Sequence, residues 1–178
     1  MTKGFTLVEI LVVIAIMTII GVLAYANFSN LKSDRDLKSA ASDVQSFLRL
    51  AQSNSTARVR CGEDTTGSGA NWLVEFRTNK INADLKCQIA SFPPPDPTLH
   101  KTLTISNGIT IDSIIGDSSC VAGFPVILTF APLYGDVSFS DTGVPNCNTS
   151  SKLTINLKDP KDNLRSVIIS KGGSVDIQ

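Results

Sequence analysis

A single acid within an apolar run is the first group in this sequence that could do chemistry. Glu9 lies in FTLVEILVVIAIMTIIGVLAYA (residues 5–26), which otherwise contains only two threonines and a glycine among apolar residues. An ionisable group in such a segment is costly and usually has a partner or a function. Two interpretations fit. Glu9 pairs with a cation, such as the α-amine of Phe5 if residues 1–4 were removed, or it reaches water at an interface.

Four cysteines form the second reactive set, and all of them follow the apolar run. No pair has C-x-x-C spacing and the only histidine is His100, so neither a metal site nor another cofactor is predicted. An even number of cysteines favours disulfides and an oxidising compartment. Among three possible pairings we favour those that each close a loop of moderate length, with free buried thiols as the alternative. These pairs are Cys61–Cys87 and Cys120–Cys147.

No residue pattern predicts an enzyme. The sequence contains no phosphate-binding loop, no H-E-x-x-H and no G-x-S-x-G. His100 follows the stretch FPPPDP (92–97) without a motif around it, and we expect it in a surface loop. The prolines predict a stiff connector between strands, with recognition by a proline-binding partner as the alternative. No small-molecule substrate is predicted.

The elements that would position these residues begin with a long helix. The apolar run would span about 33 Å as a helix, enough for a hydrocarbon core of about 30 Å. No site typical of signal-peptide cleavage follows it, so we expect it to be retained. Beyond Phe28, apolar residues at alternating spacings of four and three predict one helical face. These residues are Leu37, Ala41, Val44, Leu48 and Ala51. We predict one helix from about Thr6 to about Ala57, with a break near Ser29–Ser33 as the alternative.

After Cys61 the pattern changes to short apolar or alternating segments separated by turn residues, which predict strands. Without helices between them, these strands predict antiparallel sheet, and the last two predict a hairpin. The predicted fold class is therefore α+β, with a long N-terminal transmembrane and amphipathic helix packed on an antiparallel β-sheet domain. The predicted strands are 72–76, 85–90, 102–106, 109–115, 125–131, 136–140, 152–158, 164–170 and 174–178.

The stretch GFTLVE (4–9), followed by the long apolar run, resembles the N-terminus of type IV pilins and pseudopilins. The resemblance implies that a prepilin peptidase cuts between Gly4 and Phe5 and that Phe5 is then N-methylated. It also implies that Glu9 pairs with the N-terminal amine of an adjacent subunit during filament assembly. Many relatives have a proline where this chain has Ala26. Its absence predicts a more continuous helix, with Gly21 as the weakest point.

The resemblance also implies a pilin fold divided along the chain into four parts. Residues 1–4 would be a cleaved leader, and 5–28 the apolar half of the helix in membrane or filament core. Residues 29–60 would be its amphipathic half, and 61–178 the antiparallel β-domain.

Two further stretches resemble the GspH/FimT branch of the pilin superfamily: LKSAASDVQSFLRLAQSNSTARV (37–59) and ILTFAPLYGDVSF (127–139). The resemblance implies a minor pilin or pseudopilin of a type IV pilus or a type II secretion pseudopilus. Some members of this branch bind DNA through a C-terminal G-R-x-R tail. Here the corresponding residues are GSVD (173–176), in which both arginines are missing.

DNA binding is therefore possible but not favoured. Sixteen basic and sixteen acidic residues cancel, whereas DNA-binding proteins usually carry a basic excess. The cations that could still contact phosphates are Arg58, Arg60, Arg165 and Lys171.

The resemblance implies a bacterial inner-membrane protein that spans the membrane once, with its C-terminal domain in the periplasm or outside, and that later enters a pilus or pseudopilus. The implied partners are other pilins, through the N-terminal helix, the prepilin peptidase and the inner-membrane assembly platform. The alternatives are a DNA receptor for uptake, an adhesive tip subunit and a plain membrane-anchored periplasmic domain.

Overall fold

The computed structural model describes residues 6–62, 69–89, 96–105, 108–117, 120–132, 135–142 and 147–178, with only the backbone for 23–30. The chain divides into two compact units, Met1–Arg35 and Asp36–Gln178. The first unit contains the beginning of the only helix in the described residues, and the second contains the rest of that helix and all described strands.

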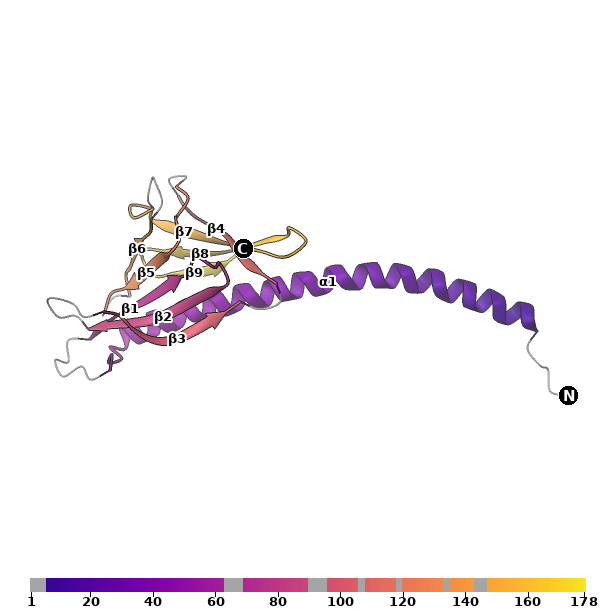
Figure 1. Cartoon of the computed structure of the whole chain (residues 1–178), viewed down its shortest axis with the longest axis horizontal. Coiled ribbons are helices and arrows are strands. Elements are labelled where there is room, and N and C mark those ends of the chain that lie inside the picture. The colour runs from indigo at the N-terminus through magenta and orange to yellow at the C-terminus, as the bar shows by residue number, and fades with distance from the viewer. Residues whose placement is uncertain are drawn as a thin grey trace. The chain divides into compact units, whose positions relative to one another are not determined.

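Helix α1 runs from Leu7 to Thr56 as one element of 50 residues (Figure 1). It continues through Gly21 and through Ser29–Ser33, so the prediction of a single helix is confirmed. Its C-terminal end closes with two backbone bonds, from Val59 N–H to Asn54 O at 2.9 Å and from Arg58 N–H to Ser55 O at 3.1 Å. This is the Schellman arrangement, in which the residue after the helix adopts a left-handed conformation. Arg58 has that conformation, with φ of 53°.

The amphipathic part of α1 packs on the β-domain through the predicted face. All five predicted side chains are buried, and Ala40 and Phe47 join them in one hydrophobic core with the strands. Within the second unit, Figure 1 shows β1, β2 and β3 lying across this part of α1. The helix is anchored by polar contacts as well, because buried Ser55 donates a hydrogen bond to Phe130 O at 3.0 Å.

The strands form two antiparallel sheets, as the alternating patterns predict. The five-stranded sheet has the order β3-β2-β1-β5-β6 and the four-stranded sheet the order β4-β7-β8-β9. The predicted α+β class is confirmed, although the sequence did not reveal a division into two sheets. The bounds are β1 Ala70–Phe76, β2 Asn82–Ile89, β3 Thr98–Thr104, β4 Thr110–Gly116, β5 Val126–Phe130, β6 Val137–Ser140, β7 Lys152–Lys158, β8 Leu164–Ser170 and β9 Val175–Ile177.

The position of His100 corrects one prediction. We expected a loop, but His100 lies in β3, which begins at Thr98 rather than Thr102. Pairing with β2 explains the longer strand, because Thr98 and Leu99 align with Cys87 and Lys86. The His100 ring also packs edge-on against Trp72, with ring centroids 5.1 Å apart.

The proline-rich stretch connects β2 with β3, where a connector between strands was expected. Residues 92–95 lie outside the described residues, and Asp96 and Pro97 are exposed just before β3.

Two disulfides tie the domain together. Cys61 is bonded to Cys87 and Cys120 to Cys147, with Cα atoms 5.6 Å apart in each pair. This is the pairing favoured from the sequence. The first bond links the segment just after α1 to β2, and the second links the segments that follow β4 and β6.

Candidate functional site

The first turn of α1 is organised around the acid of the apolar run. Thr6 precedes the helix and Glu9 is its third residue, which is the spacing of a capping box. The Thr6 N–H donates to Glu9 Oε2 at 3.4 Å, and the Glu9 N–H donates to Thr6 Oγ1 at 3.3 Å. Thr6 O also accepts from the N–H of Ile10 at 3.3 Å. The side chains therefore satisfy backbone donors that a helix start leaves without intrahelical partners.

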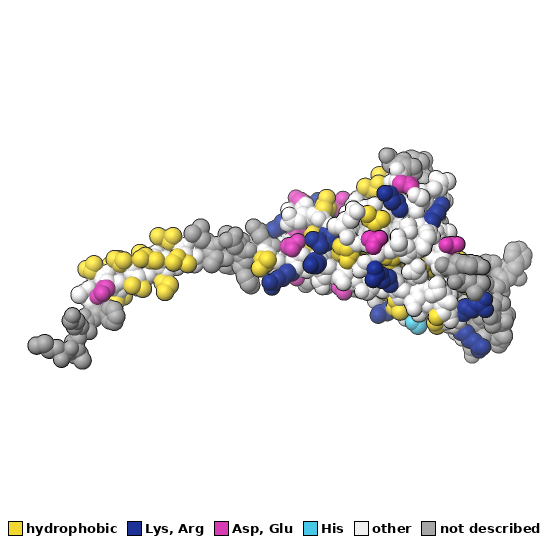
Figure 2. Space-filling model, turned by 180° about the vertical axis from the view of Figure 1, so that it is seen from behind, with side chains coloured by type: hydrophobic (Ala, Val, Ile, Leu, Met, Phe, Trp, Pro, Cys, Tyr) yellow, Lys and Arg dark blue, Asp and Glu magenta, His cyan; other side chains and the backbone are white. Residues whose placement is uncertain are grey.

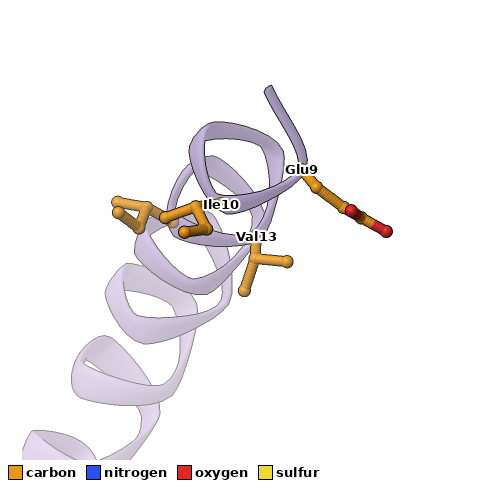
Figure 3. Close-up of a pocket in the computed structure, with 4 residues that line it drawn as sticks. Glu9, Ile10 and Val13 are labelled. Carbon is orange, nitrogen blue, oxygen red and sulfur yellow. The ribbon is translucent and has the colours of Figure 1, made fainter. Parts of the chain in front are cut away.

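The Glu9 carboxylate remains exposed while it caps the helix. Its capping bond is longer than a typical N–H···O bond of about 2.9–3.0 Å, and it involves one carboxylate oxygen. Figure 3 shows the Glu9 side chain extending outward from the helix and pointing away from Ile10. Glu9, Ile10, Val13 and Ile14 border a shallow depression of about 240 Å³. A cation that approached this surface would meet a carboxylate at the edge of apolar side chains.

The part of α1 that follows, up to Val22, is apolar on every face. On the side visible in Figure 2, most side chains of its described part are hydrophobic. A helix that is hydrophobic all round is normally buried in protein or membrane. Within the described residues, no helical stretch combines the length and apolar character needed to cross a bilayer. Large apolar side chains 51% to 78% exposed are Leu7, Val8, Ile10, Leu11, Val12, Val13, Ile14, Ile16, Met17, Ile19, Ile20 and Val22.

Gly4 and Phe5, the predicted cleavage and methylation residues, lie outside the described residues. The structure does bring Thr6 and Glu9 together, and our interpretation of the sequence did not assign a role to Thr6. The signal was present as T-x-x-E immediately before an apolar helix, which is the sequence signature of a capping box.

The cations predicted as candidate DNA contacts come from different places. Arg58 and Arg60 follow the C-terminal end of α1. Arg165 is the second residue of β8 and Lys171 follows the last, so about 20 Å of extended strand separates these two residues. Lys171 is engaged locally, because its Nζ donates to Asn148 O at 3.2 Å. On the β-domain face visible in Figure 2, Lys and Arg side chains are interspersed with Asp and Glu.

The segment aligned with the DNA-binding tail docks the C-terminal hairpin on α1. Val175 O accepts hydrogen bonds from Gln45 Nε2 at 2.8 Å and Arg49 Nη2 at 3.0 Å. Gly173 has a φ of 83°, and a Cβ there would lie 2.2 Å from Gln52 Nε2. Packing against the helix thus explains Gly173 without a ligand.

Two ionisable groups of the β-domain have shifted pKa values. Hydrogen bonds from the hydroxyl and then the N–H of Ser151 lower the pKa of Asp117. A hydrogen bond from Lys158 Nζ to Asp162, 2.7 Å long, raises the pKa of Lys158. Both pairs are on the surface at the ends of strands, Asp117 just after β4 and Lys158 at the end of β7. The described residues contain no group of three potential metal ligands.

Comparison with known proteins found a match in the N-terminal segment. Residues 1–25 match a family model described as the prokaryotic N-terminal methylation motif. No curated protein and no solved structure showed a significant match to the chain.

Proposed function

We propose that this chain is a minor pilin or pseudopilin. Its N-terminus carries the methylation motif of type IV pilin-like prepilins. The chain would be a structural subunit of a type IV pilus or a type II secretion pseudopilus. The observation that carries the proposal is the capped start of α1, which is apolar on every face apart from Glu9 as far as Val22 and lies within a methylation motif. The motif indicates processing, and the exposed apolar surface requires an environment that shields it from water.

The apolar surface must be shielded from water both before and after assembly. Each large apolar side chain that becomes fully buried contributes about 1.5–3 kcal/mol. Twelve such side chains between Leu7 and Val22 are exposed in the single chain, so shielding them from water, in a membrane or among neighbouring helices, contributes on the order of 20 kcal/mol. Before assembly, the inner membrane would shield the same surface, with the β-domain on the periplasmic side.

Glu9 would set the register between subunits. Cleavage between Gly4 and Phe5 creates a new α-amine, which is a cation even after methylation. A carboxylate buried without a partner is strongly unfavourable, whereas one that meets an amine keeps its charge compensated. A neighbouring helix would therefore bind with its N-terminus near Glu9. Other pilins, the prepilin peptidase and an inner-membrane assembly platform are the partners that this sequence of events requires.

Substitution of Glu9 tests this role. The capping box allows the charge to be removed separately from the cap. Gln retains the capping geometry but loses the charge, because a capping box accepts either Glu or Gln. We expect Glu9→Gln to be cleaved after Gly4 and to fold, but to enter sheared filaments at least tenfold less than the unsubstituted chain. Quantitative immunoblots of the filament fraction measure incorporation, and mass spectrometry measures cleavage.

Asp176→Asn provides the matched control, because it removes one exposed carboxylate from the β-domain. It should assemble normally. Normal incorporation of Glu9→Gln would rule out charge pairing at Glu9.

A further inference from the structure

The outer edge of β3 differs from the other edges of the two sheets. At β6, Val137 N–H donates to Lys171 O at 2.8 Å. At β4, Ile114 O accepts from Ala122 N–H, also at 2.8 Å. At β9, Val175 O accepts from side chains of α1. Among the described residues, no hydrogen bond reaches the outer edge of β3, so this edge presents unpaired backbone groups.

The register identifies which backbone groups point outward. Ile105 N–H donates to Ile81 O at 2.8 Å, and the antiparallel register continues from there as far as Lys101, beyond which it shifts between Leu85 and Lys86 of β2. In an antiparallel ladder, every second residue directs both its N–H and its C=O to the neighbouring strand. Because Ile105 directs its N–H to that side, Leu103 and Lys101 direct their N–H and C=O groups to β2. The N–H and C=O groups of Thr102 and Thr104 therefore point away from the sheet. An added strand needs such a row of donors and acceptors.

A groove lies beside this edge, between β3 and α1. It has a volume of about 360 Å³ and is lined by Asp43, Ser46, Phe47, Leu50, Lys101 and Leu103. Lys101 and Leu103 are two residues apart, so their side chains project to the same face of the strand. The groove thus has apolar side chains on both walls, a cation on the β3 wall and an acid, Asp43, on the α1 wall.

We propose that this edge and groove dock an extended segment of a partner protein, which adds to the sheet as a further strand. The charge on the β3 wall defines the chemistry of that segment. A residue opposite Lys101 would be acidic, and the residue opposite Leu103, two positions away, would be aliphatic and enter the groove. Opposite charges on facing strand positions are stabilising and like charges are destabilising.

The same charge argues against a second copy of β3 as the occupant. Lys101 is the central residue of β3, so two antiparallel copies paired about their centres would place Lys101 opposite Lys101. This repulsion is the usual way in which an edge lysine prevents self-association. An acidic residue on a partner strand would attract Lys101 instead. The edge therefore favours acidic strands over a second copy of β3.

A synthetic strand tests the proposal with the full-length chain in detergent. The probe is a fluorescein-labelled peptide, Thr-Val-Thr-Glu-Thr-Val-Thr, which reads the same in both directions and places Glu at its centre. The comparison peptide has Lys in place of Glu. We expect fluorescence anisotropy to show about two- to fivefold tighter binding of the Glu peptide. Lys101→Glu should reverse that preference.

A pair of substitutions at one position tests the backbone contact. Thr104→Pro removes an outward N–H, and proline is tolerated on edge strands, whereas Thr104→Val retains the N–H. We expect Thr104→Pro to bind the Glu peptide about fivefold less tightly than Thr104→Val. Circular dichroism melting checks that each variant folds.

Three outcomes would overturn the proposal. They are equal binding by the two Thr104 variants, an unchanged peptide preference in Lys101→Glu, and no binding of either peptide at millimolar concentration. Self-association of the chain that Thr104→Pro abolishes would instead assign the edge to a second copy. None of these measurements depends on filament assembly. A negative result would therefore contradict strand addition and leave the proposed pilin role untouched.

Discussion

Glu9 combines two roles that belong to different states of the molecule. In the single chain it caps the helix together with Thr6, and this role could be predicted from the T-x-x-E pattern alone. The proposed pairing with a neighbour's amine concerns an assembled state, which a single chain does not contain. The resemblance to pilins suggested the second role, and the structure adds the first.

Gly173 is the residue for which the structure makes the sharpest prediction. Its φ of 83° is costly for a residue with a Cβ, and a Cβ would lie 2.9 Å from Gly135 O. We expect Gly173→Ala to reduce the free energy of unfolding by about 2 kcal/mol. Urea unfolding followed by the fluorescence of Trp72, the single and buried tryptophan, measures it.

The neighbouring glycine is the control for this prediction. A Cβ at Gly172 would meet only Ser170 Oγ, at 3.9 Å. Gly172→Ala should therefore unfold at nearly the same urea concentration as the unsubstituted chain. Equal stability of the two alanine variants would show that the hairpin adjusts its packing on α1.

Among the elements, α1 is followed by a residue, Arg58, whose replacement by glycine should stabilise the fold. Arg58 adopts the left-handed conformation that usually belongs to glycine at this position of a Schellman motif. We expect Arg58→Gly to raise the free energy of unfolding by about 1 kcal/mol, because it relieves the backbone cost. Arg58→Ala retains the Cβ and should leave stability unchanged. The same urea assay measures both variants. If their free energies of unfolding rise equally, the lost charge and not the backbone explains the effect.

Most elements could be predicted from the sequence because their patterns are local. The period of α1 and the alternation within β7 and β8 follow from side chains that face a core, and their predicted ranges agree with the structure to within a residue. The start of β3 was missed because its side chains are mostly exposed, so it carries little apolar alternation. Pairing with β2 defines that strand. The division into two sheets likewise depends on contacts between residues far apart in the chain, which no local pattern records.

At the scale of the whole molecule, the two disulfides make similar contributions to the second unit. Their bonded cysteines are 26 and 27 residues apart. Closing loops of this length in the unfolded chain accounts for about 3.5 kcal/mol of stability each. We expect paired alanine substitutions, at Cys61 with Cys87 or at Cys120 with Cys147, to lower the free energy of unfolding by about that amount. A loss below 1 kcal/mol in either double variant, measured in urea, would contradict this estimate.

The same bonds determine how the β-domain responds to a pulling force. Tension that enters through α1 reaches Cys61 and passes through its bond directly to Cys87, so β1 lies outside the loaded path. The second bond removes the segment between Cys120 and Cys147 in the same way. At about 3.4 Å per extended residue, each loop withholds roughly 90 Å of chain from extension. When its sheets are pulled apart, an oxidised subunit therefore extends by roughly 180 Å less than a reduced one.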